Sequence, residues 1–144
     1  RNHSSAASDV YKRQPIICYE SVYGEYVTEY TRSGSKLFAI ITNDGWWDVS
    51  EGHKQHLSYA KLRAIENRRN IVRSANTGVS AIINYRGEIE DSIEYGEEGF
   101  INTNVGLIEE KTFYVNYGDY IFRISLFFFI IIGLHFLATI VKIK

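Results

Sequence analysis

The sequence predicts a domain of mixed α and β structure followed by one helix long enough to cross a membrane. Apolar runs of strand length, such as residues 37–42 (LFAIIT), alternate with segments whose apolar side chains recur at helical spacing. Clusters of Gly, Ser, Asn and Asp separate these runs, as turns do. Residues 120–141 are apolar almost throughout. Together these three observations predict an α/β fold class with a terminal membrane helix.

The composition excludes some classes of function. The chain has 144 residues, with 16 basic and 17 acidic side chains and a net charge of −1. This balance gives no electrostatic reason to expect a nucleic-acid partner. The one cysteine, Cys18, cannot form a disulfide within the chain. Outside the apolar tail and the polar start, about 105 residues remain, enough for one small domain at most.

The beginning of the chain is unlike the rest. The sequence contains no methionine, so we expect it to be a piece of a longer protein. Residues 1–14 are polar and without periodicity, and we interpret them as a non-native leader, with a native flexible leader as the alternative. The expected organisation is therefore a leader (1–14), the C-terminal part of a catalytic domain (15–118), and a transmembrane helix with a short tail (119–144).

The first elements are a strand, a helix and a second strand. Residues 15–20 (PIICYE) begin with a proline, which the first position of a strand tolerates, and continue with β-branched side chains up to Cys18. Residues 22–32 show helical spacing and end at a Ser-Gly-Ser sequence. The continuous apolar run 37–42 is typical of a strand that is covered on both faces.

The remaining elements alternate in the same way. A turn-rich loop with two adjacent tryptophans occupies residues 43–48, and a helix is expected over 55–69, with Leu57, Ala60, Lys61 and Ala64 on one face and Arg63 elsewhere. The predicted later elements are short strands at 71–74, 79–85 and 88–93, then an acidic loop over 94–111 with one strand at 99–104.

The apolar tail is the predicted membrane anchor. Residues 120–141 would span about 33 Å as a helix, against about 30 Å for the hydrocarbon core of a bilayer. Lys142 and Lys144 follow the span, which by the positive-inside rule places the C-terminus in the cytoplasm and the domain outside it. Arg123, on the other flank, can extend outward to water. Three tyrosines precede or begin the span as a predicted interfacial belt: Tyr114, Tyr117 and Tyr120.

Cys18 is the candidate nucleophile. A thiol between a strand and a helix can be exposed at a sheet edge, with backbone N–H groups nearby to hold an oxyanion, which suits acyl transfer. The alternative is that Cys18 is a small buried hydrophobic residue. A Cys–His dyad with His53 or His56 also stays open. The four histidines lack a metal-ligand spacing with Cys18, so no metal is expected: His3, His53, His56 and His135.

Several short motifs occur in an order that resembles the nitrilase, or carbon-nitrogen hydrolase, superfamily. The motifs are residues 18–20 (CYE) after an apolar strand, 42–47 (TNDGWW), 55–56 (QH) leading to 62–66 (LRAIE), and 73–80 (RSANTGVS). With the terminal helix they resemble the C-terminal part of bacterial apolipoprotein N-acyltransferases. The resemblance covers residues 15–144.

The resemblance implies the second half of an α-β-β-α sandwich and a set of site residues. Cys18 matches the nucleophile that takes an acyl group as a thioester, and the Tyr19 backbone N–H matches an oxyanion donor. Glu20 matches a supporting glutamate beside the nucleophile. The positions that match the substrate-lining loop are Asn43 and Trp46, and Trp47, if exposed, would suit the membrane interface together with Trp46.

The resemblance also implies partners and a location. The acyl donor would be a phospholipid and the acceptor the N-terminal amine of a diacylglyceryl-cysteine lipoprotein, with no cofactor. The location would be the bacterial cytoplasmic (inner) membrane, with the domain on the periplasmic side.

In this family a base Glu and a Lys lie upstream of the Cys, and Lys12 and Glu20 are too near Cys18 to match them. We therefore expect this chain alone to be inactive. The alternatives are an anchored amidase that hydrolyses small amides and a membrane-anchored interaction domain without catalysis.

Overall fold

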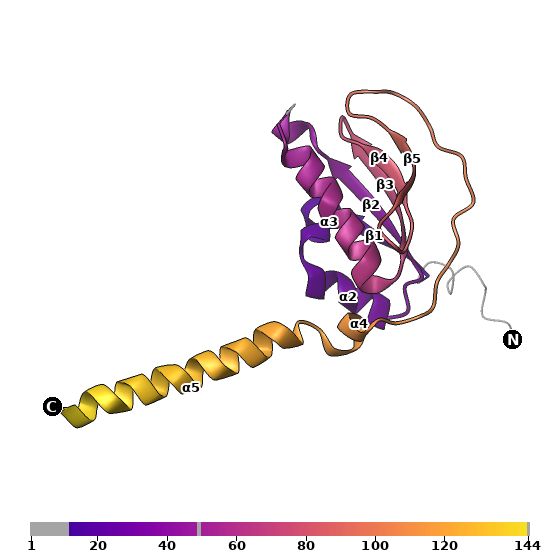
Figure 1. Ribbon diagram of the computed structural model, residues 1–144. Coiled ribbons are helices and arrows are strands. Elements are labelled where there is room, and N and C mark those ends of the chain that lie inside the picture. Colours follow the sequence, from indigo (N-terminus) through magenta and orange to yellow (C-terminus); the bar gives the residue numbers. More distant parts are fainter. Residues whose placement is uncertain (1–11, 49, 144) are drawn as a thin grey trace, which may run out of the picture.

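The computed structural model describes residues 12–48 and 50–143, which form one five-stranded sheet with helices packed on it and a long helix that extends away (Figure 1). The strands lie in the order β1-β2-β3-β4-β5, the first three parallel and the last two antiparallel to their neighbours. Their bounds are Arg13–Ile17, Leu37–Asn43, Asn70–Asn76, Ser80–Ile83 and Ile89–Ile93. The mixed fold class is thus confirmed. Because β1, β2 and β3 are parallel, their carboxyl ends meet at one edge of the sheet.

The first strand lies earlier in the chain than predicted. β1 begins at Arg13, inside the predicted leader, whose residues 1–11 lie outside the described part of the chain. It ends at Ile17, because Cys18 has a φ of 49° and starts a short 3-10 helix, η1 (Cys18–Val22). A positive φ is incompatible with a continuing strand. The strand predicted to run from Pro15 to Cys18 therefore begins two residues earlier and ends one residue earlier than expected.

Two helices cover one face of the sheet. α2 (Gly24–Arg32) and α3 (Gly52–Asn67) lie side by side against it, as Figure 1 shows. Both helices were predicted. α2 begins two residues later than expected, and α3 begins three residues earlier and ends two residues earlier than expected. The core between helices and sheet consists of fully buried apolar side chains, chiefly Ile16, Val27, Phe38, Ile40, Ala60, Ala64 and Ile71. Arg63, predicted to lie away from the packed face of α3, is buried and donates to Val22 O at 3.0 Å.

The other face of the sheet is partly open. Ile17 and Ile41 are paired in the register of β1 and β2 and are 52% and 53% exposed, whereas Phe38 and Ile40 point to the helices and are buried. The apolar run 37–42 is therefore covered on one face, not on both. Side chains alternate along a strand, so each apolar run supplies both a buried row and an open row.

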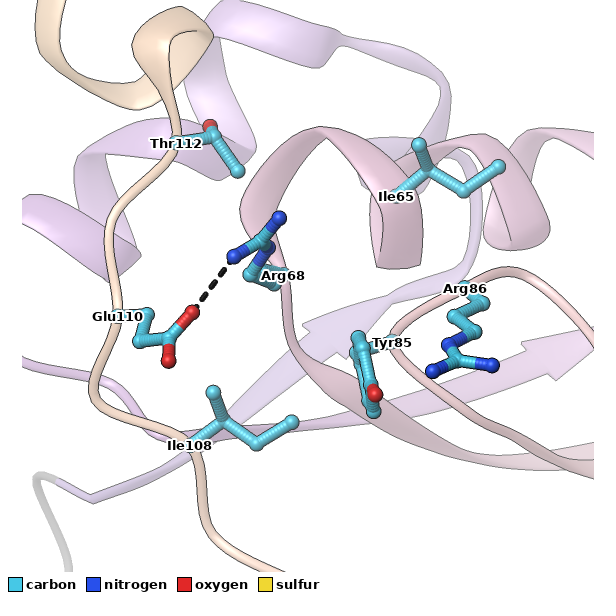
Figure 2. A pocket seen from close by; sticks show the side chains of 7 residues that line it. All are labelled: Ile65, Arg68, Tyr85, Arg86, Ile108, Glu110 and Thr112. Carbon is cyan, nitrogen blue, oxygen red and sulfur yellow. Dashed lines mark hydrogen bonds and ion pairs between the residues drawn. The ribbon is translucent and has the colours of Figure 1, made fainter.

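The segment after β5 contains no strand at 99–104, contrary to the prediction. Gly99, Phe100 and Ile101 line a hollow with Val72 and Ile82, so the segment lies over the face of the sheet rather than beside an edge, where a strand could pair. The segment then runs along the outside of the domain in Figure 1. At its far end Arg68 Nη1 donates to Glu110 Oε2 at 2.6 Å across a second hollow, drawn in Figure 2.

Two helices end the chain. α4 (Phe113–Tyr117) is a short helix whose Val115 is buried in the domain, and α5 (Tyr120–Ile143) extends away from it (Figure 1). Within α5, Tyr120–Val141 is long and apolar enough to cross a membrane, and the domain buries none of it. This candidate span agrees with the sequence prediction. Tyr117 and Tyr120 are exposed, but Tyr114 packs close to Gly24, so it belongs to the domain rather than to a belt.

Candidate active site

Cys18 lies at the sharp turn that joins β1 to η1, and its side chain is partly exposed. A φ of 49° in a residue other than glycine costs on the order of 1 kcal/mol and persists where surrounding contacts fix it. Here Ser21 Oγ donates to Cys18 O at 2.9 Å, and His56 Nε2 lies 3.3 Å from the same carbonyl oxygen. The turn that presents the thiol is therefore held from its own helix and from α3.

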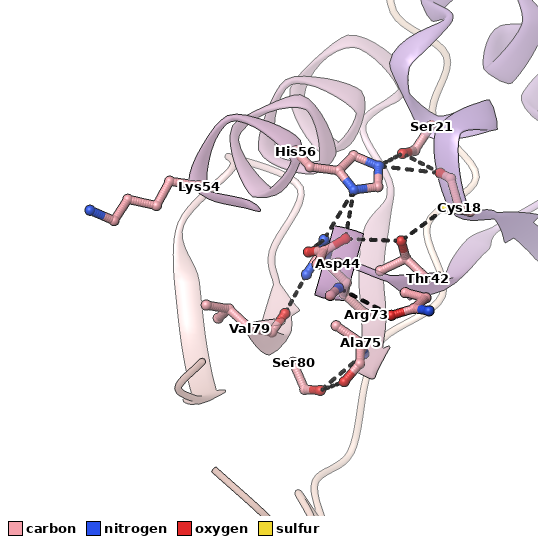
Figure 3. A network of polar contacts seen from close by, with 12 residues as sticks. Cys18, Ser21, Thr42, Asp44, Lys54, His56, Arg73, Ala75, Val79 and Ser80 are labelled. Carbon is pink, nitrogen blue, oxygen red and sulfur yellow. Dashed lines mark hydrogen bonds and ion pairs between the residues drawn. The ribbon is translucent and has the colours of Figure 1, made fainter. Parts of the chain in front are cut away.

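A buried polar network lies behind this turn (Figure 3). Asp44 is fully buried, and its Oδ1 accepts from His56 Nδ1 at 2.9 Å while its Oδ2 accepts from Arg73 Nη2 at 2.5 Å. His56 Nε2 lies 3.0 Å from Ser21 Oγ, which completes the connection to Cys18. An ionised carboxylate has only acceptors, so Nδ1 of His56 carries a proton toward Asp44, and Nε2 can donate to Ser21 Oγ or Cys18 O only when it carries a proton as well. The network joins the end of β2, the start of α3, β3 and the Cys18 turn.

The electrostatics of Asp44 follow from these contacts. Burial alone would raise the pKa of its carboxyl group, but the hydrogen bonds from His56 and Arg73 and the charge of Arg73 lower the pKa from 3.8 to about 2. Asp44 is therefore ionised at neutral pH. A buried carboxylate between a guanidinium and an imidazole fixes the orientation of the imidazole ring, and with it the Cys18 carbonyl.

The thiol itself contacts Thr42. Thr42 Oγ1 lies 3.3 Å from Cys18 Sγ and 3.1 Å from Asp44 Oδ1, so its one hydroxyl proton can be donated to either acceptor. Donation to sulfur favours the thiolate, which is the nucleophilic form. Thr42 thus connects the buried network with the thiol directly.

Glu20 supports the turn from the outside. Its Oε2 accepts from Ile17 N at 2.8 Å, and its Oε1 accepts from Tyr26 Oη at 3.3 Å. Tyr26 Oη is in turn 2.6 Å from Tyr30 Oη, and this hydrogen bond, with burial, raises the pKa of Tyr30 to about 12. The Glu20 carboxylate is thus held by two donors next to the thiol-bearing turn.

The predicted loop residues lie in different surroundings. Asn43 Oδ1 accepts from Gly45 N at 3.1 Å and shapes the turn before η2 (Gly45–Trp47). Trp46 is 82% exposed, whereas the Trp47 ring lies 6.5 Å from that of Tyr19 and 5.2 Å from that of His56. The structure therefore places Tyr19 and Trp47 beside the network behind Cys18, and Trp46 outward on the surface.

A groove opens beside the thiol. Its walls are apolar and aromatic surface from the end of β1, η1 and the first turn of α2. The lining residues are Ile17, Cys18, Tyr19, Glu20, Tyr23, Gly24, Glu25 and Tyr26. An apolar groove with a nucleophile in its wall suits a substrate that has a long apolar part.

The two histidines considered as partners of Cys18 have different roles. His56 contacts the carbonyl oxygen of Cys18 and not its sulfur, and the His53 ring packs 4.5 Å from that of Tyr95. Neither histidine is therefore placed as the partner of the thiol in a Cys–His dyad. Among residues 12–48 and 50–143, no cluster of His, Cys, Asp or Glu has the arrangement of a metal site.

Sequence reasoning did not identify Asp44, Arg73, Thr42 or Ser21 as parts of the site. One signal was present in the sequence of β3, where Arg73 interrupts an apolar run. In the structure Arg73 is only 2% exposed. A buried arginine requires a buried acceptor. Asp44, in the turn after the neighbouring strand, is that acceptor.

Comparison with known proteins agrees with this architecture. Residues 3–109 match the family model of carbon-nitrogen hydrolases. The apolipoprotein N-acyltransferase of Geobacter metallireducens is 41% identical over 104 residues, which are 72% of this chain and 20% of that protein. Apolipoprotein N-acyltransferase 2 of Leptospira interrogans is 33% identical over 141 residues, 95% of this chain and 23% of that protein. The chain thus spans about a fifth of the length of these curated relatives.

Solved structures show the same fold. A carbon-nitrogen hydrolase from Helicobacter pylori superposes with a TM-score of 0.53 at 14% identity, covering 60% of this chain and 37% of that one. An amidase from Nesterenkonia gives a TM-score of 0.53 at 15% identity, covering 79% of this chain and 43% of that one. At these identities the likeness concerns the fold alone. Because residues 3–109, most of this chain, match the family model, the chain belongs to the carbon-nitrogen hydrolase family.

Proposed function

We propose that this chain is the nucleophile-bearing part of an N-acyltransferase that moves a fatty acyl group from a phospholipid to the N-terminal amine of a diacylglyceryl-cysteine lipoprotein. The observation that carries the proposal is the position of Cys18. Its thiol lies on a strained turn, contacts Thr42 Oγ1, and opens into an apolar groove on a domain joined to a candidate membrane span. The relatives named apolipoprotein N-acyltransferase support the substrate class.

The reaction would have two steps. A base takes the proton of the Cys18 thiol, and the thiolate attacks the ester carbonyl of the phospholipid, so that a carbon–sulfur bond forms. The bond from the acyl carbon to the glycerol oxygen then breaks, and this oxygen takes the proton from the base and leaves as lysophospholipid. The lipoprotein amine then attacks the thioester, an amide bond forms, and the thiol is regenerated with the proton that the amine loses. A thiolate suits both steps because it is a strong nucleophile and a good leaving group. The Tyr19 backbone N–H, next to the thiol, is our candidate for an oxyanion donor.

A base and a second oxyanion donor are also needed. In the described part of the chain the polar side chain that contacts the thiol is Thr42, which can donate a hydrogen bond but is not a base. We propose that a base Glu and an oxyanion-stabilising Lys come from outside this chain, and that the 144-residue chain alone does not transfer acyl groups. Acyl transfer by the purified chain would contradict this.

The surrounding residues have proposed roles in the same reaction. Glu20, held by Ile17 N and Tyr26, would keep the turn in place and present its charge to the incoming amine. Asn43, Trp46 and Trp47 would line the approach to the site, with the exposed Trp46 at the lipid surface. The enzyme would act in the cytoplasmic (inner) membrane with this domain on the periplasmic side, as Lys142 and Lys144 indicate.

The fold also supports a second candidate, an anchored amidase in which water, and not an amine, resolves the acyl-enzyme. The structural likeness to an amidase fold is the observation in its favour. The apolar groove and the candidate membrane span favour a lipid substrate over a small amide. A non-catalytic interaction domain would leave the strained Cys18 turn without a use.

Mass spectrometry distinguishes these functions. A full-length protein carrying this chain is incubated with phospholipid, and its intact mass is measured before and after hydroxylamine. We expect a hydroxylamine-labile fatty acyl group on Cys18 that disappears when a diacylglyceryl-peptide amine is added, and no such group in Cys18→Ala. A free Cys18 with hydrolysis of small amides would favour the amidase. A free Cys18 with neither activity would favour the interaction domain.

A further inference from the structure

The start of α5 is bonded to the helix that lines the groove. Glu25, in the first turn of α2, accepts from the backbone N of Asp119 at 2.8 Å and from Arg123 Nη2 at 2.8 Å, both with its Oε1. Asp119 immediately precedes α5, and Arg123 lies in its first turn. One carboxylate oxygen therefore contacts both the backbone and a side chain of the candidate membrane span.

The turn before α5 fits this contact closely. Gly118 has a φ of 66°, and a Cβ added there would collide with Glu25 Oε1. Arg123 Nη1 also donates to Tyr117 O at 3.3 Å, and Asp119 Oδ1 accepts from Phe122 N at 3.0 Å. The backbone conformation and the side chains thus agree in directing α5 away from the domain at this point.

The other end of α2 is bonded to the helix before α5. Arg32 Nε donates to Val115 O at 2.6 Å, and the buried Val115 anchors α4 in the domain. At the near end, a Cβ added at Gly24 would lie 2.7 Å from the Tyr114 hydroxyl, so Tyr114 packs directly on the first turn of α2. α2 is therefore connected through its first and last turns to the segment that leads into the membrane span.

The same first turn of α2 forms a wall of the groove at Cys18, through Gly24, Glu25 and Tyr26. We propose that Glu25 is a positioning residue that fixes α5 relative to this groove, so that the groove opens at the surface of the bilayer that α5 enters. The inference rests on the proposed function in one respect, that the substrate is a membrane lipid. The ester of a phospholipid stays near the lipid surface, because its acyl chains remain in the hydrocarbon layer. The height of the thiol above that surface therefore decides whether the thiol reaches the ester.

The location of the contact determines how strong it can be. The Glu25 and Arg123 side chains are 46% and 61% exposed, and an ion pair with that exposure contributes little in bulk water. Next to a hydrocarbon layer the effective dielectric constant is lower and the attraction is correspondingly larger. Glu25 therefore acts best where α5 enters a membrane, and the Asp119 backbone bond adds direction to it.

The single cysteine makes the test direct. The 144-residue chain is labelled with a nitroxide on Cys18, reconstituted in phosphatidylethanolamine–phosphatidylglycerol vesicles, and the depth of the label is measured by power-saturation electron paramagnetic resonance with oxygen and a nickel chelate. We expect the wild-type label to lie at the lipid interface. Glu25→Ala and Arg123→Gln should both shift it toward water, with lower oxygen and higher nickel accessibility.

Glu51→Gln is the matched control, because Glu51 pairs with Lys54 on the surface beside α3, outside the contacts that link α2 to α4 and α5. It should leave the label depth unchanged. Circular dichroism checks that each variant is folded, and Arg123→Gln tests the proposal even if Glu25→Ala is unfolded. An unchanged depth in the folded variants, or a wild-type label fully in water, would overturn the proposal. The depth of the label is measured without turnover, so it tests the position of the groove and not the reaction. Whether acyl transfer occurs is tested separately, by looking for the acyl adduct on unlabelled Cys18.

Discussion

Replacing Asp44 with asparagine is the most informative perturbation of the site. Asp44 is fully buried and interacts with three side chains, those of Arg73, His56 and Thr42. Asparagine has nearly the same shape but no charge, and its amide supplies only one acceptor oxygen. The substitution therefore leaves the buried Arg73 guanidinium without its counter-ion while the packing volume is kept.

The magnitude follows from two quantities. The pKa of Asp44 lies at about 2 against 3.8 ordinarily, a difference that corresponds to about 2.5 kcal/mol of stability at neutral pH. Removing one partner of a buried ion pair costs about 3–5 kcal/mol in proteins, because the other charge stays buried. We expect Asp44→Asn to lower the free energy of unfolding by about 3 kcal/mol at pH 7.

The pH dependence has a definite sign. The folded pKa of Asp44 is lower than the unfolded one, so its contribution is fully present above about pH 4 and is lost as the pH falls through about 2. The stability difference between wild type and Asp44→Asn should therefore shrink across this window.

The assay is urea unfolding in detergent micelles, followed by the fluorescence of the two tryptophans, one of which, Trp47, packs against His56. Asp48→Asn, an exposed aspartate in the same loop, is the control and should change stability little. An Asp44→Asn variant within about 0.5 kcal/mol of wild type at pH 7 would refute the reasoning.

Three further predictions concern the turn, the groove and the start of α5. Thr42→Val should slow alkylation of Cys18 by iodoacetamide at pH 7 roughly fivefold, which corresponds to about 1 kcal/mol for one hydrogen bond to sulfur. The control Thr139→Val, in α5, should not change the rate, and equal rates for Thr42→Val and wild type would exclude the Thr42 contact. Tyr26→Phe should lower the pKa of Tyr30 from about 12 toward 10, because the hydrogen bond that Tyr30 donates to Tyr26 is the main cause of the shift; a ¹³C NMR titration measures it, and an unchanged value would contradict the Tyr26–Tyr30 contact. Gly118→Ala should destabilise the turn between α4 and α5 by roughly 1–2 kcal/mol, and this should be measured as faster trypsin cleavage near Lys111. The control Gly133→Ala, at a position with open space around it, should not change the cleavage rate; equal rates for Gly118→Ala and wild type would show that this turn does not need the positive φ.

The sequence predicted the elements whose signals are local. The apolar run of β2, the helix α3 and the apolar α5 each occupy nearly the predicted residues, because their patterns need no distant partner. The predicted strand at 99–104 failed for the opposite reason. A strand exists only where another strand pairs with it, and residue composition does not reveal that this segment lies over the sheet face.

The site shows the same division. Cys18, Tyr19 and Glu20 could be proposed from the sequence because they form one short motif after an apolar strand. Their support was missed because its members are far apart in sequence: Arg73 lies 29 residues from Asp44, and His56 lies 38 residues from Cys18. The positive φ of Cys18 could not be predicted either, because nothing in its immediate sequence requires it and contacts such as those from Ser21 and His56 maintain it.

The topology nevertheless explains why these residues meet. β1, β2 and β3 are parallel, so Cys18 after β1 and Asp44 after β2 emerge at the same edge of the sheet. α3 starts from that edge as well and brings His56 between them. Sites in α/β folds form at the carboxyl ends of parallel strands for this reason. The buried Asp44–Arg73 pair then ties β2 to β3, and a change in Asp44 should be felt first at the Cys18 turn, which His56 and Ser21 contact.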